Sequence, residues 1–165
     1  MPNYCDNRIT VTGEEEDMAE FYELVQSDAS MFAFEKVVPE PAFFDLMKSG
    51  KMDFVVDGEV QTHGHWIEGE GLDGEKVARP LSEAELAQFK GLARLDPDCW
   101  RDAHWGTKWG AIDVFEDTDE ETATYSFTTA WSPPHGIIEA LREKFPDLDI
   151  VAFFDCEEDQ EAGYY

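Results

Sequence analysis

The fold of this chain is decided by residues 111–154, which read AIDVFEDTDEETATYSFTTAWSPPHGIIEALREKFPDLDIVAFF. Polar and apolar side chains alternate in Ala111–Phe115 and again in Ala123–Thr129, a pattern that predicts two half-buried strands. The acidic link Glu116–Glu121 joins these strands as a hairpin. Ser132-Pro133-Pro134 then predicts a helix start, because serine can cap a helix and proline suits its first turn.

A helix and a closing strand complete this segment. The predicted apolar stripe of the helix consists of Ile137, Ile138, Leu141 and Phe145. Arg142 and Lys144 lie near its carboxyl end, as the helix dipole prefers, and Pro146 ends it. Residues 149–154 form the last predicted strand. The order of elements is therefore strand, strand, helix, strand.

The first 38 residues predict a strand and a helix. Residues 7–12 alternate polar and apolar side chains up to Gly13. Apolar residues then recur at helical spacing, namely Met18, Phe21, Tyr22 and Val25. Glu14–Asp17 occupy the first turn of this helix, where its dipole favours negative charge. Residues 31–38 predict a further short strand, stopped by the prolines that follow.

Residues 39–104 interrupt this regular pattern and form a predicted insertion. Within it, residues 54–60 predict a hairpin with an Asp-Gly turn. Ser82 and Glu85 form the capping box of a helix. We find no internal repeat in the chain.

Together these elements predict an α+β protein with a ferredoxin-like plait, which has an antiparallel four-stranded sheet with two helices on one face. The plait would comprise residues 1–155 as a single domain, with an inserted helical and hairpin region at about 39–104. Residues 156–165 are acidic and are predicted to form a flexible tail.

The chain is strongly acidic, with 12 Lys and Arg residues, 38 Asp and Glu residues and a formal charge of −26. A compact domain of this length is about 40 Å across, and the same length of duplex DNA carries roughly 24 charges. Direct binding to nucleic acid is therefore disfavoured, because the phosphates would be repelled. The charge has three remaining interpretations: a solvated surface that resists aggregation, an acidic face for a basic partner, or adaptation to high salt.

The sequence also predicts the cellular environment. No apolar run approaches the 18 residues of a membrane span, and the first residues lack the basic and apolar regions of a signal peptide. Cys5, Cys99 and Cys156 are odd in number and contain no Cys-x-x-Cys pair. This pattern argues against a disulfide framework and against a zinc ribbon. We therefore expect a cytoplasmic protein with reduced thiols.

Three separated motifs resemble a known family. The opening MPNYCDNR followed by ITVTG, the stretch Trp105–Trp109 and the stretch Thr129–Pro134 resemble the YubB-type ferredoxin-like proteins of phages and conjugative plasmids. Two features depart from that family: Tyr4, where tryptophan is expected, and the acidity of the surface. The resemblance implies the plait and an origin in a mobile element, acting in the cytoplasm of a host bacterial cell. It assigns no catalytic residue.

An aromatic cluster is one candidate binding site. It consists of Trp105, Lys108, Trp109 and Trp131. Trp131 lies at a strand-to-helix junction, where unpaired helix amides point outward, so the rings and Lys108 suit a small anion or a peptide segment. The alternative is structural, because large aromatic side chains often only pack in the core.

The chemistry of metals and nucleophiles has less support. His63 and His65 face the same side of an extended segment and are two potential zinc ligands, but no spacing specifies a third. A reactive cysteine needs a positive environment, which this chain does not offer. No phosphate-binding loop, dinucleotide fingerprint or nucleophile elbow is present. The sequence therefore predicts no cofactor, no metal ligand and no catalytic residue.

The acidic hairpin is the second candidate site. Its binding residues would be Glu116, Asp117, Asp119, Glu120 and Glu121. Acidic runs also lie at 14–17 and 155–161, and a merged stripe would offer carboxylates in place of phosphates to a basic groove. The leading hypothesis is therefore an interaction protein that occupies a basic, normally nucleic-acid-binding surface of a host defence or regulatory protein. Its alternatives are a small-ligand or metal-dependent enzyme that uses the Trp cluster or His63 and His65, and an assembly module without a site.

Overall fold

The computed structural model describes residues 3–45, 53–56, 59–62, 74, 82–92 and 96–165. The chain divides into two compact units. The first unit comprises Met1–Pro39 and Arg101–Tyr165, and the second comprises Glu40–Trp100. The second unit is therefore inserted into the first.

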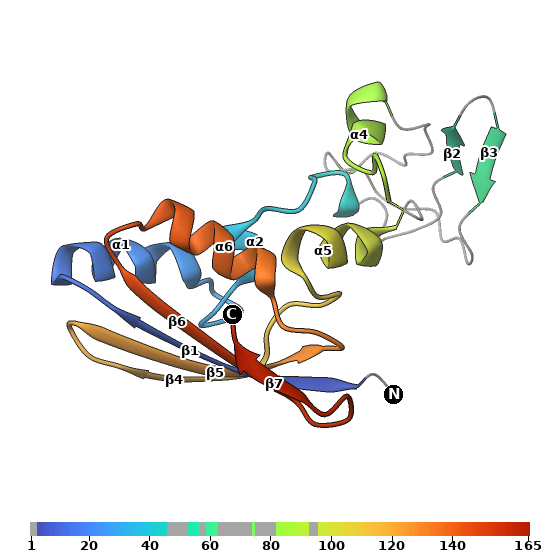
Figure 1. The fold of residues 1–165 in the computed structure, drawn as a ribbon. Helices are drawn as coiled ribbons and strands as arrows, with labels where there is room; N and C mark the ends of the chain where they lie inside the picture. The colour runs from blue at the N-terminus through green and yellow to red at the C-terminus, as the bar shows by residue number, and fades with distance from the viewer. Residues whose placement is uncertain (1–2, 46–52, 57–58, 63–73, 75–81, 93–95) are drawn as a thin grey trace. The chain divides into compact units, whose positions relative to one another are not determined.

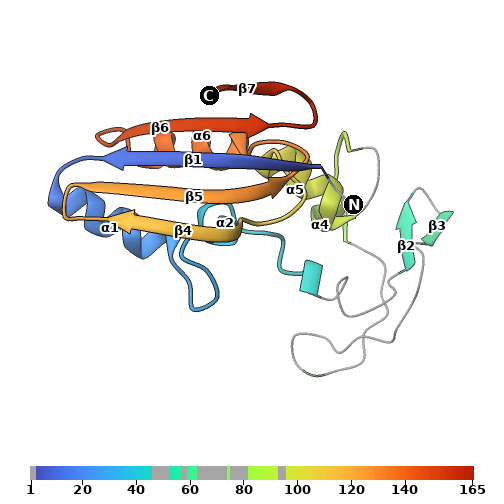
Figure 2. The same ribbon diagram turned by 90° about the horizontal axis from the view of Figure 1, so that it is seen from below.

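The first unit is built on a five-stranded antiparallel sheet with the order β4-β5-β1-β6-β7 (Figure 2). The strands are β1 (Tyr4–Thr12), β4 (Ile112–Thr118), β5 (Thr122–Ala130), β6 (Asp149–Cys156) and β7 (Glu161–Tyr164). β1 lies in the centre and pairs with β5 on one side and β6 on the other. The prediction of four strands is wrong in number, because β7 adds a fifth.

The prediction that residues 156–165 form a flexible tail is wrong, because β7 lies within them. Residues 157–160 form a turn, after which Glu161–Tyr164 pair with residues 153–156 of β6. The backbone amide of Tyr165 then donates to the carbonyl of Ala152 at 3.0 Å. The sequence does not predict this strand, because an edge strand with exposed side chains needs no alternating apolar pattern.

Helices cover one face of this sheet (Figure 1). α1 (Glu15–Val25) buries Met18, Phe21 and Val25, and α6 (His135–Lys144) buries Ile137, Ile138 and Leu141. These are the apolar stripes that the sequence predicts. Along β1 every second residue is buried toward the helices. The opposite face of the sheet is turned toward the viewer in Figure 2, and no described element of this unit covers it.

A chain of aromatic rings runs through the core between sheet and helices. Each ring centroid lies 5.0–6.2 Å from the next, in the order Phe145, Phe21, Tyr125, Phe32, Phe127, Phe34 and Trp105. Phe34 belongs to a short helix, α2 (Phe34–Val37). The strand predicted over residues 31–38 is therefore wrong, because Phe32, Ala33 and Phe34 are all buried in succession and do not alternate.

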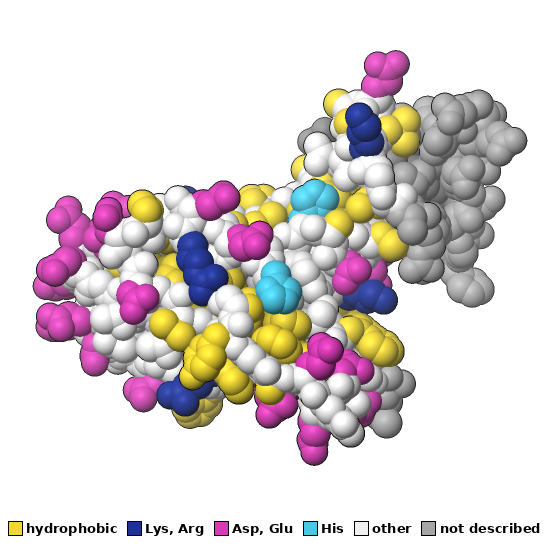
Figure 3. Space-filling view, in the orientation of Figure 1, with side chains coloured by type: hydrophobic (Ala, Val, Ile, Leu, Met, Phe, Trp, Pro, Cys, Tyr) yellow, Lys and Arg dark blue, Asp and Glu magenta, His cyan; other side chains and the backbone are white. Residues whose placement is uncertain are grey.

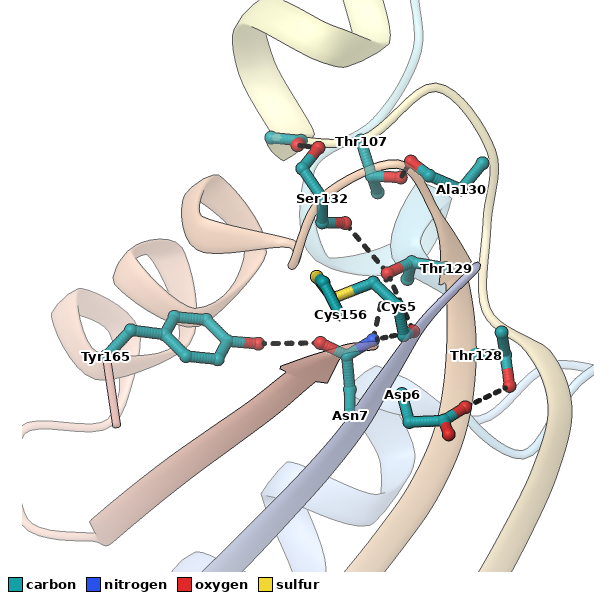
Figure 4. The surroundings of a disulfide bond; sticks show 11 residues. Cys5, Asp6, Asn7, Thr107, Thr128, Thr129, Ala130, Ser132, Cys156 and Tyr165 are labelled. Carbon is teal, nitrogen blue, oxygen red and sulfur yellow. Dashed lines mark hydrogen bonds between the residues drawn. A yellow bond between two sulfur atoms is a disulfide. The ribbon is translucent and has the colours of Figure 1, made fainter. Parts of the chain in front are cut away.

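A disulfide bond joins Cys5 of β1 to Cys156 of β6 (Figure 4). This bond contradicts the prediction of reduced thiols for these two residues. They are 151 residues apart in sequence, but pairing of β1 with β6 brings their Cα atoms to 4.3 Å. The third cysteine, Cys99, is unpaired and half-buried.

The second unit contains the predicted hairpin and capped helix. β2 (Asp53–Val56) pairs antiparallel with β3 (Glu59–Thr62). Ser82 caps α4 (Glu83–Ala87), and its capping box with Glu85 is complete, which confirms that prediction. Four buried rings form the described core of this unit, namely Phe43, Phe44, Phe89 and Trp100. α5 (Pro97–Trp105) begins in this unit and ends in the first.

No helix in the described part of the chain combines the length and the apolar character that a membrane crossing requires.

Candidate functional site

The structure brings together the two tryptophan-containing motifs. The Thr107 hydroxyl donates to the Ala130 carbonyl at 2.8 Å, and the Ser132 hydroxyl donates to the Gly106 carbonyl at 2.5 Å. These bonds lie at the carboxyl end of β5 (Figure 4). Gly106 has a φ of +86°, which glycine adopts at little cost. The loop after α5 is therefore fastened to the loop before α6.

The four residues of the predicted aromatic cluster have different roles. Trp105 is buried, donates its indole N–H to the Val38 carbonyl at 2.9 Å and packs edge-on against Phe34. Trp109 and Trp131 are 38% and 45% exposed. The Lys108 ammonium lies 5.7 Å from the centre of the Trp131 ring. Trp105 therefore belongs to the core, and only Lys108, Trp109 and Trp131 are at the surface.

The start of α6 presents few of the unpaired amides that an anion site would need. Pro133 and Pro134 have no N–H to donate. The amide of His135 donates to the Pro133 carbonyl at 2.9 Å, and the amides of Ile137 and Ile138 donate to Pro134. The residue that precedes the helix is Pro134, so the prediction that Ser132 caps it is wrong. Of the first four amides of α6, that of Gly136 alone lacks a backbone acceptor in the described ranges, which is too few for the predicted anion site.

The other predicted chemistry is not assembled in the described residues. His63 and His65 lie outside them. Within the described ranges, no group of three or more His, Cys, Asp or Glu side chains is placed to hold a metal ion. Cys5 and Cys156 are in the disulfide bond, which leaves Cys99 as the described thiol.

Two acidic runs meet at one end of the sheet. The Gly13 amide donates to the Glu121 carbonyl at 3.1 Å, and the Tyr22 hydroxyl donates to the Asp119 carbonyl at 2.9 Å. The tip of the β4–β5 hairpin is thereby held against the start of α1. The side chain of Leu148 packs against Gly13, which brings the β6 start to the same end.

We name this surface the acidic end. It consists of Glu14, Glu15, Glu16, Asp17, Asp119, Glu120, Glu121, Asp147 and Asp149. All of these side chains are exposed except Asp17, which is half-buried. Acidic side chains gather at this end of the unit, on the left of Figure 3. The nearest basic residue in sequence, Lys144, lies in the last turn of α6.

The five acidic residues predicted at the hairpin differ in orientation and contacts. Glu116 lies opposite Tyr125 in register and turns toward the helices, whereas Asp117 faces the uncovered side of the sheet. Asp119 accepts from the amides of Glu121 and Thr122 at 2.9 and 2.7 Å, so it shapes the turn. The side chains of Glu120 and Glu121 are exposed.

Glu116 acts on two neighbouring phenols. The pKa of Tyr125 is raised, chiefly by burial and then by the charges of Glu116 and Tyr22. The pKa of Tyr22 is raised by burial, by Asp119 and by Glu116. Glu116 therefore acts on groups in the interior of the unit and is not part of the acidic end.

The third acidic run lies at the other end of the sheet. Asp155 is opposite Asp6 near the start of β1, whereas the acidic end adjoins Thr12 and Gly13 at its finish. The three runs therefore do not form one stripe.

The negative charge is concentrated in the first unit. This unit contains 25 acidic and six basic residues, a formal charge of −19, and the second unit carries −7. The acidity of the chain is thus mainly a property of the first unit.

The structure also places a hollow of about 460 Å³ on the uncovered face of the sheet. Arg8, Phe115 and Phe153 are among its lining residues. We did not single out these residues from the sequence. The available signal is the strand period, which places them on the face opposite the buried side chains of the central strands.

Comparisons with known proteins support the fold. Residues 104–164 match the family model described as the ferredoxin-like domain in Api92-like protein. The crystal structure of protein api92 from Yersinia pseudotuberculosis resembles this chain with a TM-score of 0.55. The alignment covers 99% of this chain and 93% of that chain at 11% identity, so it shows the fold alone. No curated protein sequence matches this chain significantly.

Proposed function

We propose that this chain is an interaction protein whose acidic end binds a basic surface of a partner protein. The observation that carries the proposal is the hydrogen bond between the Gly13 amide and the Glu121 carbonyl. It joins two acidic runs that lie about a hundred residues apart in sequence, and the contact of Leu148 with Gly13 adds Asp147 and Asp149. The result is one surface with nine carboxylates from three segments of the chain.

Electrostatics would act mainly on the encounter with the partner. Opposite potentials accelerate association and select against wrong partners more than they add affinity. Exposed charges are screened over about 8 Å at physiological ionic strength. The complex should therefore form faster and more tightly at low salt.

The partner surface that fits best is one that ordinarily binds nucleic acid. A compact unit of the size of the first unit is about 33 Å across, and duplex DNA of that length carries roughly 19 charges. The formal charge of this unit is −19. Carboxylates at the acidic end would take the place of phosphates. The resemblance to proteins of phages and plasmids makes a bacterial defence or regulatory protein, in the cytoplasm, the partner class that we favour.

The test is capture of partners from bacterial lysate at low and at roughly physiological salt. A variant with E15Q, E16Q, E120Q and E121Q removes four charges from the acidic end. Its matched control, with E157Q, E158Q, D159N and E161Q, removes four charges at the opposite end of the sheet. We expect a basic, nucleic-acid-binding protein to be captured by the unmodified chain and by the control, and to be lost with the first variant.

Duplex DNA added to the captured complex should release the partner if the two compete for one surface. The proposal is wrong if no basic protein is recovered at either ionic strength. It is equally wrong if both four-residue variants retain the same amount of partner.

A further inference from the structure

The hollow on the uncovered face is organised around one row of side chains that crosses all five strands. Phe115 of β4 lies opposite Ser126 of β5, which lies opposite Arg8 of β1. Arg8 lies opposite Phe153 of β6, which lies opposite Tyr164 of β7. All five residues therefore project from the same face.

Aromatic rings form the two sides of this hollow. Phe115 is 74% exposed on the edge strand β4. On the other side, the rings of Phe153 and Tyr164 meet edge-to-face with centroids 5.2 Å apart. Three strand spacings separate Phe115 from Phe153, a distance of about 14 Å. The space between them is wide enough for one extended peptide segment.

A bulge in β4 directs Phe115 toward the hollow. Ile112 lies opposite Thr128 and Phe115 opposite Ser126, so two residues of β4 occupy the place of one in β5. Asp113, within the bulge, has a φ of +51°. Bulges re-aim side chains and increase the local twist of a strand.

The hollow carries charged groups that have no partner in the described structure. Three carboxylates line it, from Asp6, Asp113 and Asp155, together with the guanidinium of Arg8. Asp6 accepts from the Thr128 hydroxyl at 3.1 Å. In the described ranges neither Asp113 nor Asp155 takes part in a side-chain hydrogen bond or an ion pair, and the same holds for Arg8. A ligand with a cation and an apolar group would satisfy both the carboxylates and the rings.

We propose that this hollow binds a basic segment of a partner protein, which places an apolar side chain between Phe115 and Phe153 and a basic side chain at each of Asp113 and Asp155. Charge complementarity selects this occupant, since three carboxylates outnumber the single Arg8 and the unit is strongly acidic. Arg8 donates to a backbone carbonyl of the segment. The proposal rests on the proposed function in one respect, namely that the partner is basic.

The three carboxylates also decide against the other occupants of an exposed sheet with aromatic residues. Single-stranded nucleic acid stacks its bases on such rings but needs a positive groove for its phosphates. A second copy of this chain would bring two units of charge −19 together.

The test is an NMR titration of the full ¹⁵N-labelled chain at roughly physiological salt. The probe is the capped peptide acetyl-Arg-Leu-Arg-Leu-Arg-amide, and its matched control is the same peptide with serine in place of leucine. We expect chemical-shift changes around Arg8, Phe115, Ser126 and Phe153 with the leucine peptide. The serine peptide should bind there roughly threefold or more weakly, because it lacks the apolar contact.

Two double variants test which residues contribute to binding of the leucine peptide. F115A with D155N should weaken the leucine peptide about three- to tenfold, as loss of one exposed ring contact and one exposed ion pair predicts. V151A with D117N changes an apolar residue and a carboxylate on the same face but outside the hollow, and should change affinity less than twofold.

Three results would overturn the inference. Shift changes confined to residues 14–17 and 119–121 would place the peptide at the acidic end. Equal affinity of the two paired variants would remove the hollow from the contact. A dimer of the unliganded chain that F115A dissociates would assign this face to a second copy.

The two proposals can fail separately. Loss of captured partner with the acidic-end variant but not with F115A and D155N would leave the proposed function intact and reject the hollow. The opposite pattern would place the basic partner on the hollow and reject the acidic end as its contact.

Discussion

The prediction for Glu116 is wrong, because its acidic neighbours in sequence suggested an exposed position on the hairpin. It belongs to an acidic run and was predicted to face a partner, but it lies opposite Tyr125 on the helix-covered face. One of its carboxylate oxygens, Oε2, is inaccessible to solvent. The strand period could have revealed this position, because Glu116 alternates with Phe115 and Asp117.

Tyr125 should make stability depend on pH in the alkaline range. Its pKa is raised by burial and by Glu116, so the folded state favours the neutral phenol. This stabilisation is fully present below the ordinary phenol pKa of about 10 and is lost as pH rises above it. We expect Y125F to reduce the decline in unfolding free energy between about pH 10 and 12, as measured by urea denaturation.

The control for this prediction is Y164F. Tyr164 is 77% exposed, so this variant removes a phenol that the fold does not bury. A Y125F protein that loses stability as steeply as the unmodified chain would contradict the prediction. Tyr22 and Tyr165, whose pKa values are also raised by burial, account for the decline that should remain.

Gly136 and Gly110 differ in how closely other atoms approach them, and the sequence does not predict this difference. A Cβ on Gly136 would collide with the carbonyl oxygen of His104, whereas a Cβ on Gly110 would meet nothing within 4 Å. Gly136 therefore permits the close approach of α6 to the end of α5. Only the three-dimensional neighbour distinguishes the two positions.

Among the elements, those with strong local patterns were predictable. The strands with alternating residues, the apolar stripes of α1 and α6, and the capping box of α4 all follow from nearest neighbours in sequence. Elements that depend on distant contacts were not predictable in this way. β7 exists because β6 offers it an edge, and α2 exists because the core accepts Phe34.

The disulfide bond was predictable in part. The predicted plait already places its first and last strands side by side, so the neighbourhood of Cys5 and Cys156 follows from the topology. The exact register does not follow from it. A count of cysteines and their spacing argued against pairing, because it ignored the sheet.

Loss of this disulfide should destabilise the first unit. The bond closes a loop across 151 residues of sequence, which restricts the unfolded chain strongly. We expect the C5S and C156S double variant to lose about 2–4 kcal/mol of unfolding free energy in urea. C99S is the matched control and should change stability much less. Equal stability of the two variants would show that the bond contributes nothing to the fold.

A small hydrogen-bond network accompanies the disulfide (Figure 4). The side-chain amide of Asn7 donates to the Cys5 carbonyl at 2.9 Å and to the Thr129 hydroxyl at 2.8 Å. The Tyr165 hydroxyl donates to Asn7 at 3.3 Å. The end of the chain is thereby attached to the centre of the sheet, as β7 also requires.

At the scale of the whole molecule, charge opposes compactness. The first unit holds 25 acidic residues against six basic ones, and their mutual repulsion is strongest at low ionic strength. The total charge was evident from composition. Its concentration in one unit and the meeting of two runs at Gly13 were not, because both depend on how the chain folds back on itself.

Stability should therefore rise with added salt. Between about 0.05 and 0.5 M NaCl the screening length shrinks from roughly 14 Å to 4 Å, which weakens repulsion across the acidic end. We expect the urea midpoint to increase over this range, and to increase less in the variant with E15Q, E16Q, E120Q and E121Q. A midpoint that is constant or falls with salt would contradict this account.

The two edges of the sheet have a consequence for self-association through backbone pairing. An unpaired edge strand is a template on which a neighbouring molecule can add its own strand. At one edge, β4 is interrupted by a bulge and carries Asp113 and Asp117. At the other edge, the four-residue β7 pairs with residues 153–156 of the longer β6 and so covers that part of its edge. The β6–β7 hairpin should therefore hinder the addition of strands from neighbouring molecules. This protection should persist in concentrated salt, where repulsion between net charges is screened.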